Sequence, residues 1–294
     1  MNKGDILGLI RAWSLPMTLA VSLVGIGYAH YLGLYYGLRI IYSLIAIAGA
    51  LLLHASVNVL NDYYDFMHGV DSPNSPTVIY RRQPLVMGSV SPSFARNLGL
   101  SLIIAGASLG IYLTIAESYL ILIFGLLGVF LLYAYTGPPF TLKYRGLGEL
   151  SVALTWGPLL IGGFFIAASG GSLTPGVLLV SLPPFFIMLA IIYANNYRDR
   201  EYDAKAGIRT LAMITARYGY QIYLGSLITA YIINALLVIM GLLPYTSLAT
   251  IPTAALIPGL TRAFKSGAHD IDARTGLLYT IYCLVYGISL MIPA

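Results

Sequence analysis

The 294-residue chain contains very little charge. Asp, Glu, Lys and Arg make up 9% of it, whereas 58% of its residues are hydrophobic. A soluble domain ordinarily has about 25% charged residues to cover its surface. Disordered chains are excluded as well, because they are poor in apolar residues. The composition therefore indicates an integral membrane protein.

Cysteine is almost absent. The chain has one, Cys283, which excludes a disulfide framework and a zinc site built from cysteines. Basic residues are also few, and the formal net charge is +5. In a membrane protein this excess reports orientation rather than nucleic-acid binding. No nucleic acid is therefore expected among the partners.

Long apolar runs are what the sequence has in abundance. A membrane-spanning helix needs about 20 mostly apolar residues, and nine segments qualify. They are residues 14–34, 40–61, 94–116, 118–136, 147–169, 175–196, 218–241, 245–262 and 276–293. We predict an all-α protein with nine transmembrane helices in a single membrane-embedded domain, residues 1–294.

The few charges are partitioned by this arrangement. The N-terminus and the loops after the second, fourth, sixth and eighth helices contain every Lys and Arg except Arg39, and every acid except Glu117. Lys and Arg concentrate on the cytoplasmic side of membrane proteins. We therefore expect a multi-pass protein of the cell membrane whose N-terminus and charged loops are cytoplasmic and whose C-terminus is outside.

The acids gather at two of these helix ends in matching patterns. The first reads Asn58-Val-Leu-Asn61-Asp62-Tyr-Tyr-Asp65, with Asp71 following, and the second reads Asn195-Asn196-Tyr-Arg198-Asp199-Arg-Glu-Tyr-Asp203. Residues three and four apart share a helix face. Each pattern thus presents an asparagine and two aspartates together. Four helices separate the two patterns, which suggests two related four-helix units.

Carboxylate and amide oxygens in this number suit Mg²⁺, which binds through one or two carboxylates, water and substrate phosphate. Two facing clusters would hold Mg²⁺ ions around a diphosphate. Cations that could bind the phosphates lie nearby: Arg81, Arg82, Lys143, Arg145, Arg198, Lys205 and Arg209. Solvated loops with local salt bridges are the alternative, and the matched spacing argues against them. Lys143 follows a helix broken at Gly137, Pro138 and Pro139. His54 is expected to be a packed polar residue.

Together these motifs resemble the UbiA superfamily of intramembrane prenyltransferases. Asn61-Asp62-x-x-Asp65 on the second helix matches the first motif of the family, and Asp199-x-x-x-Asp203 matches the second. The resemblance covers nearly the whole chain. It implies that both motifs bind Mg²⁺ and a polyprenyl diphosphate from the cytoplasmic side, with the prenyl tail in a cavity open to membrane lipid.

The resemblance also implies roles for individual residues. The implied metal ligands are Asn58, Asp62, Asp65, Asp71, Asn195, Asp199 and Asp203. The implied catalytic residues are Asp62, Asp65, Asp199, Asp203 and Lys143. The implied substrate-binding residues are Asn58, Asn61, Asn195, Arg81, Arg82, Lys205, Arg209, Arg11 and Arg198. Many members have a tyrosine where this chain has Pro139, so Tyr135 or Tyr144 is the candidate partner of Lys143.

The acceptor is indicated by short segments. Arg11-x-x-Ser14-Leu15-Pro16 and the Tyr135–Glu149 run are most similar to the dihydroxynaphthoate prenyltransferases of menaquinone synthesis. The expected reaction is transfer of a prenyl group to an aromatic quinone precursor, dihydroxynaphthoate or 4-hydroxybenzoate, through an allylic carbocation. Transfer to geranylgeranylglyceryl phosphate in ether-lipid synthesis stays open. So does a transporter of an anionic lipid-like substrate, which would carry charges at mid-membrane depth. A lipid-phosphate hydrolase would display a His or Cys nucleophile near the arginines, and the sequence shows no such arrangement.

Overall fold

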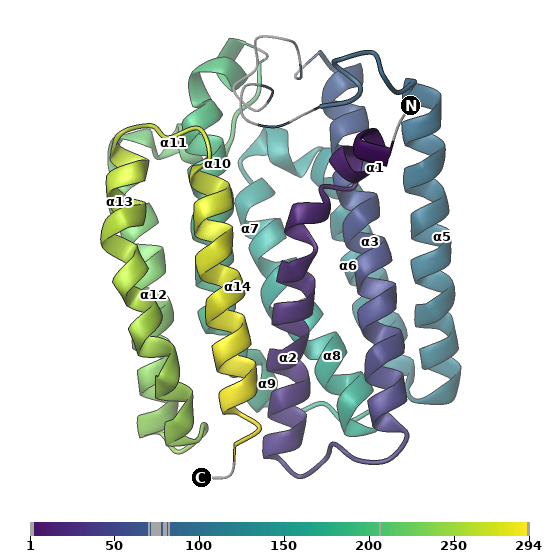
Figure 1. Cartoon of the computed structure of the whole chain (residues 1–294), viewed down its shortest axis with the longest axis vertical. Coiled ribbons are helices and arrows are strands. Elements are labelled where there is room, and N and C mark those ends of the chain that lie inside the picture. Colours follow the sequence, from purple (N-terminus) through teal and green to yellow (C-terminus); the bar gives the residue numbers. More distant parts are fainter. Residues whose placement is uncertain are drawn as a thin grey trace.

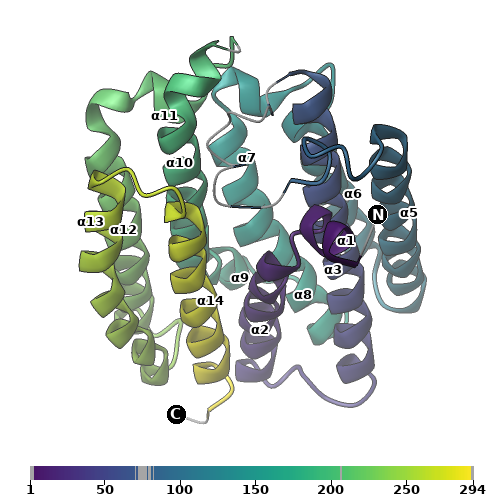
Figure 2. The same cartoon turned by 45° about the horizontal axis from the view of Figure 1, so that its top comes forward.

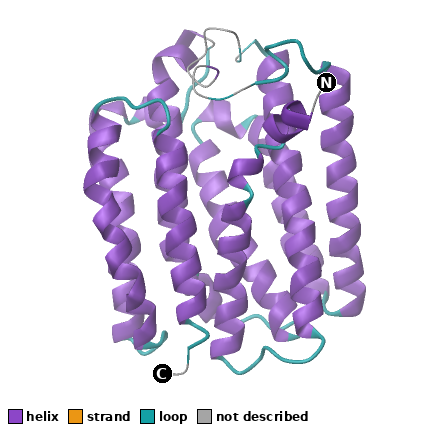
Figure 3. Cartoon of the chain, in the orientation of Figure 1, coloured by secondary structure: helices purple, strands orange, loops and turns teal. Residues whose placement is uncertain are grey.

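The computed structural model describes residues 3–69, 71, 78, 81, 83–205 and 207–292. Within this part of the chain every regular element is a helix and no strand occurs (Figure 3). The all-α prediction is confirmed. The helices run side by side in one bundle whose upper end contains α1 and the ends of α3 and α10 (Figure 1).

The first half of the bundle supplies α1 (Lys3–Leu9), η1 (Ala12–Ser14), α2 (Pro16–Tyr31), α3 (Arg39–Met67), α5 (Pro92–Ala116), α6 (Tyr119–Thr136) and η2 (Leu142–Arg145). The second supplies α7 (Gly148–Leu154), η3 (Thr155–Leu159), α8 (Leu160–Ser169), α9 (Pro175–Val180), α10 (Leu182–Lys205), α11 (Leu211–Ile214), η4 (Ala216–Tyr218), α12 (Gly219–Ile239), η5 (Tyr245–Leu256), α13 (Ile257–Lys265) and α14 (Ile271–Ser289).

Among the described residues, seven helices are long and apolar enough to cross a membrane. They are Ala12–Tyr31, Arg39–Met67, Pro92–Ala116, Tyr119–Thr136, Gly148–Ser169, Pro175–Lys205 and Ala216–Ile239. Each overlaps one of the first seven predicted spans. The predicted count of nine and the two four-helix units are not confirmed and stay predictions.

The two remaining predicted spans have physical reasons to differ. Residues 245–262 form η5 and α13 rather than one α-helix, with Pro252 inside η5, and a proline removes a backbone donor. Residues 276–293 overlap α14, whose first turn contains Asp272 and which buries Tyr279, Tyr282 and Tyr286. α14 packs beside α2 and α10 (Figure 1), so it needs less apolar surface than a lipid-facing helix.

The bundle is packed unevenly. The main hydrophobic core joins α2, α8, α10, α12 and α14. By contrast, few residues of α5 and α6 are buried, and these helices close the bundle beside α3 and α8. Between α7 and α8, Pro158 lies in a π-helical turn, Thr155–Leu159. Such turns frequently mark functional sites, and Thr155 and Trp156 of this turn line the central cavity.

Candidate active site

A cavity of about 360 Å³ runs from the charged end of the bundle down between α3, α5, α6 and α8. Its polar end is lined by residues from both acidic motifs, from the loop after α3, from η2 and α14, and by Arg11 at the start of η1. These are Arg11, Asn58, Asn61, Asp65, Asp71, Arg81, Lys143, Asn195, Asn196, Asp199, Asp203 and Asp272. The two motifs, far apart in sequence, therefore share one cavity.

The first motif lies at the upper end of α3. The Asn58 amide donates to the Ile10 carbonyl at 2.9 Å and to Ser14 Oγ at 3.2 Å. Asp62 is fully buried and accepts hydrogen bonds from Arg11 at 2.5 Å and from Arg81 at 2.9 and 3.1 Å. Asp62 is not among the described residues that line the cavity. The structure thus places it behind two guanidinium groups.

Arg11 reaches Asp62 from an unusual backbone conformation. Its φ of 47° is in the left-handed region, which is unfavourable for a residue other than glycine and often marks a functional site. The Ser14 hydroxyl donates to the Arg11 carbonyl at 2.8 Å, which holds this turn. From this turn the Arg11 side chain lines the cavity and reaches Asp62.

Asp65 and Lys143 form an ion pair on the cavity wall. Lys143 Nζ lies 2.7 Å from Asp65 Oδ2, and the Tyr144 hydroxyl donates to Asp65 Oδ1 at 2.8 Å. Burial lowers the pKa of Lys143, but the Asp65 carboxylate outweighs it, and the pKa stays well above its ordinary value. The ammonium is therefore charged at any working pH. Tyr144 is the tyrosine that shares Asp65 with Lys143.

The second motif lies at the end of α10. Arg198 donates two hydrogen bonds of 2.7 Å to Asp199. It also donates to Asn195 Oδ1 and Asp272 Oδ1, both at 2.9 Å. The predicted substrate-binding residue Arg198 is thus engaged in joining α10 to α14. Asp203 is 4% exposed, and no hydrogen bond or ion pair to its carboxylate is present within the described residues.

Asp71 and Arg81 come from the loop after α3. Asp71 lines the cavity and accepts a hydrogen bond from Gln83. Burial, together with the charges of Asp65 and Asp62, raises the pKa of Asp71 to about 7. A carboxyl group so crowded by other carboxylates gains from a cation beside it.

Other predicted residues lie elsewhere. Lys205 and Arg209 are exposed and are not among the described residues that line the cavity. Arg82 lies outside the described residues.

The sequence did not single out Asn196 or Asp272 for the site. Asn196 is 1% exposed, lines the cavity and accepts a hydrogen bond from the Asn195 amide at 3.2 Å, whereas its own Nδ2 has no partner within the described chain. The repeated asparagine beside Asp199 was the available signal for Asn196. No spacing rule connects Asp272 to α10.

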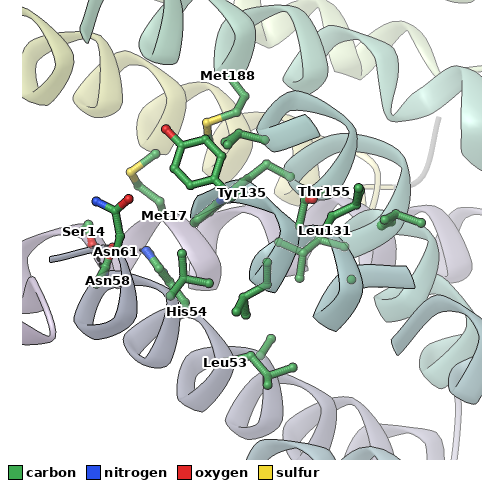
Figure 4. Close-up of a pocket in the computed structure, with 18 of the residues that line it drawn as sticks. Ser14, Met17, Leu53, His54, Asn58, Asn61, Leu131, Tyr135, Thr155 and Met188 are labelled. Carbon is green, nitrogen blue, oxygen red and sulfur yellow. Dashed lines mark hydrogen bonds between the residues drawn. The ribbon is translucent and has the colours of Figure 1, made fainter. Parts of the chain in front are cut away.

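His54 is a packed polar residue, as expected, but it also lines the cavity. Its ring lies between Thr18 Oγ1 at 2.8 Å and Ser14 Oγ at 3.2 Å, and edge-on to Trp156 at 4.7 Å. Figure 4 shows His54, Asn58 and Asn61 on one side of the cavity. Through Ser14, His54 supports the Arg11 turn.

These residues fit a hard divalent cation. No preformed group of three or more His, Cys, Asp or Glu occurs within the described ranges, because Asp62, Asp65 and Asp199 are paired with arginine or lysine. However, Asp203 has no partner there, and Asn61 Oδ1 is buried without a hydrogen bond. Mg²⁺ needs only one or two protein oxygens when phosphate completes its shell, so the donor set suits it.

Below His54 the cavity is apolar. Its walls there include Leu53, Leu113, Phe124 and Leu159, and Thr155 donates its hydroxyl to the Ser151 carbonyl at 2.8 Å. Figure 4 shows Leu131 and Thr155 across the cavity from His54. The view with the top of the bundle brought forward shows α1 at the end where α3 and α10 end (Figure 2). The arrangement suits a ligand with an anionic head and a long apolar tail.

Comparisons with known proteins agree with this geometry. Residues 15–281 match the UbiA prenyltransferase family. The 1,4-dihydroxy-2-naphthoate octaprenyltransferase of Bacillus subtilis is 30% identical over 234 residues, which cover 78% of this chain and 74% of that protein. UbiA prenyltransferase domain-containing protein 1 of Mus musculus is 35% identical over 248 residues, which cover 80% and 69%.

Solved structures show the same fold. A UbiA homolog from Archaeoglobus fulgidus bound to GPP and Mg²⁺ has a TM-score of 0.67 at 17% identity, covering 98% of this chain and 99% of that one. A structure described as digeranylgeranylglyceryl phosphate synthase has a TM-score of 0.61 at 18% identity, covering 98% and 96%.

Proposed function

Because the chain belongs to the UbiA prenyltransferase family, we propose that it transfers the prenyl group of a polyprenyl diphosphate to an aromatic quinone precursor, with dihydroxynaphthoate as the first candidate. The protein is an integral membrane prenyltransferase, and residues 1–294 form one catalytic domain. The charge partition supports a cytoplasmic position for the acidic end of the bundle and for the N-terminus, and an outer position for the C-terminus.

The observation that carries the proposal is the cavity itself. Its polar end joins Asp65 and Lys143 of one half to Asp199 and Asp203 of the other, and its opposite end is apolar. A prenyl diphosphate has this same division between an anionic head and a hydrocarbon tail. A soluble phosphate compound would leave the apolar half of the cavity unfilled.

Asn61, Asp65, Asp71, Asp199 and Asp203 are the residues that would hold Mg²⁺. When bound, the ion supplies positive charge that stabilises the departing diphosphate. Arg81 and Lys143 line the same space and bind the phosphate oxygens. The carbon–oxygen bond to the diphosphate breaks, the acceptor carbon forms the new carbon–carbon bond, and the acceptor releases a proton. The apolar walls exclude water, which would otherwise capture the allylic cation.

The acceptor assignment rests on likeness to the Bacillus subtilis enzyme and on the cations at the cavity. A carboxylated aromatic ring needs a cation and an apolar slot, and Arg11, Met17, His54 and Trp156 all line the cavity. Geranylgeranylglyceryl phosphate is the second candidate, because one structural neighbour is described as a digeranylgeranylglyceryl phosphate synthase.

The test is an acceptor panel. The purified protein receives Mg²⁺, geranylgeranyl diphosphate and one acceptor at a time: dihydroxynaphthoate, 4-hydroxybenzoate or geranylgeranylglyceryl phosphate. Mass spectrometry is expected to show prenylated dihydroxynaphthoate as the main product. Prenylation of the glyceryl phosphate alone would contradict the acceptor assignment and leave the prenyl transfer standing.

A further inference from the structure

The apolar half of the cavity reaches far into the bundle. On α3 its lining begins at Asp65 and ends at Ile45, a separation of about 30 Å at the rise of an α-helix. That length is close to the thickness of the hydrocarbon layer, also about 30 Å. The cavity therefore has room along its axis for prenyl chains of very different lengths.

Its lower walls contain glycines from three helices. Gly110 of α5, Gly125 and Gly128 of α6, and Gly163 of α8 all line the cavity. Gly125 and Gly128 are three residues apart and so share one face of α6. None of the four has a positive φ, so no backbone requirement accounts for glycine at these positions.

Glycines elsewhere in the helices have a clear packing reason. A Cβ atom on each of several of them would lie only 2.4–2.5 Å from an atom of a neighbouring helix. These are Gly25, Gly27, Gly162 and Gly287. Close contact between helices through small residues is usual in membrane proteins.

The four cavity glycines differ from these. A Cβ atom on Gly110, Gly125, Gly128 or Gly163 would meet no described atom within 4 Å. Glycine in a helix interior is less stable than alanine, and here no close packing offsets that cost. What the missing side chains leave is open space in the cavity.

A ligand is indicated independently at the other end of the same cavity. Asn196 is almost fully buried there, and its amide nitrogen has no hydrogen-bond partner within the described residues. A buried donor without a partner is costly unless a ligand or water accepts from it. The polar end thus indicates a bound head group, and the glycines lie where its tail would extend.

We propose that Gly110, Gly125, Gly128 and Gly163 determine the length of prenyl chain that the enzyme accepts, by keeping the lower cavity open for long donors. This inference rests on the proposed function. Gly128 lies seven residues below Tyr135 on α6, about 10 Å along the helix. The dimethylallyl group is shorter than this separation and the geranylgeranyl chain is longer, so a side chain at position 128 obstructs only the long donor.

The experiment compares dimethylallyl and geranylgeranyl diphosphates as donors for the wild-type protein and Gly128→Leu. The ratio of kcat/KM for the long donor to that for the short donor is expected to fall by at least about 10–200-fold, the range that a single methylene group produces in an apolar pocket. The kcat/KM for the dimethylallyl donor is expected to stay unchanged, which also shows that the variant is folded. Gly163→Leu is expected to act in the same direction.

The matched control is Gly225→Leu on α12. A Cβ atom at Gly225 also meets nothing within 4 Å, but Gly225 is not among the described residues lining the cavity. This variant is expected to keep the wild-type ratio. Should Gly128→Leu fail to fold, Gly128→Ala is expected to lower the ratio in the same direction by less.

An unchanged ratio, or equal loss of both donors in a folded Gly128→Leu protein, overturns the role of the glycines. A wild-type protein that turns over neither donor contradicts the proposed function instead. In that case, donor binding tests the role of the glycines. Each donor with Mg²⁺ is then tested for a rise in Tm, which Gly128→Leu is expected to abolish for the long donor alone.

Discussion

Replacing Lys143 by methionine removes the cation that pairs with Asp65 while keeping most of the side-chain volume. The ammonium lies 2.7 Å from Asp65 Oδ2, and the exposed fractions of the two side chains are 10% and 5%. After the change, the Tyr144 hydroxyl at 2.8 Å is the one side-chain partner of Asp65 left within the described residues. The variant therefore leaves a nearly buried carboxylate with one neutral partner.

We expect Lys143→Met to lose both stability and rate. Breaking a buried ion pair from one side costs about 3–5 kcal/mol of stability, and the remaining Tyr144 hydrogen bond places the expected loss at about 3 kcal/mol. Losing a group that stabilises developing charge costs about 10²–10³ in rate. We expect kcat/KM for the prenyl donor to fall by that factor. We also expect Mg²⁺ to raise the Tm of Lys143→Met more than that of the wild type, because the ion replaces the missing positive charge beside Asp65.

A double-variant cycle separates the two roles of Lys143. Asp65→Asn combined with Lys143→Met is uncharged on both sides, so it is expected to recover much of the lost stability and none of the lost activity. Thermal unfolding in detergent and donor kinetics provide the two readouts. Because the pKa of Lys143 is held above its ordinary value, its charge persists through neutral and mildly alkaline pH, and deprotonation of this group should not limit the wild-type rate there. Additive stability losses in the cycle, or an unchanged kcat/KM in Lys143→Met, would refute the reasoning.

Thorough chelation of divalent cations is expected to abolish turnover, and added Mg²⁺ to restore it; full turnover in EDTA would show that no metal is needed. Asp203→Asn is expected to raise the Mg²⁺ concentration for half-maximal rate by at least about 10–100-fold, the cost of losing even an outer-shell partner of a metal, without lowering Tm, since no described group pairs with that carboxylate; titrating Mg²⁺ in the assay checks this, and an unchanged requirement would remove Asp203 from the metal site. Asp62→Ala is expected to lower turnover by about 10²–10³ and also to lower Tm, because Arg11 and Arg81 lose their shared partner; near-normal turnover would assign Asp62 a purely structural role.

Helix-face arithmetic concerns the first acidic motif. The spacing of Asn58, Asp62 and Asp65 placed them at one helix end, and Asn58 and Asp65 do line the cavity. The same arithmetic could not foresee that Asp62 bonds to Arg11, 51 residues away. That contact depends on a left-handed turn at Arg11, which no local propensity rule predicts for arginine.

Contacts between distant helices could not be predicted either, because helix-face spacing relates only residues that are close in sequence. Arg198 carried a predicted role in substrate binding, but its partner Asp272 is 74 residues away and comes close only through the packing of α14 against α10. The segment 245–262 was apolar enough to be predicted as a span, and hydropathy alone does not report that η5 forms there instead of an α-helix. Apolar length indicates that a segment can be buried, whereas Pro252 decides its hydrogen bonding.

We propose above all that both acidic motifs bind one prenyl diphosphate and that prenyl transfer takes place in the cavity. The most direct measurement follows diphosphate release and prenylated acceptor in the same reaction, with and without Mg²⁺. We predict equimolar formation of the two products, dependent on Mg²⁺ and lost in Asp203→Asn at limiting Mg²⁺. Diphosphate released without prenylated acceptor would indicate a hydrolase, and neither product together with uptake of the donor into vesicles would indicate a transporter; either result would contradict the account.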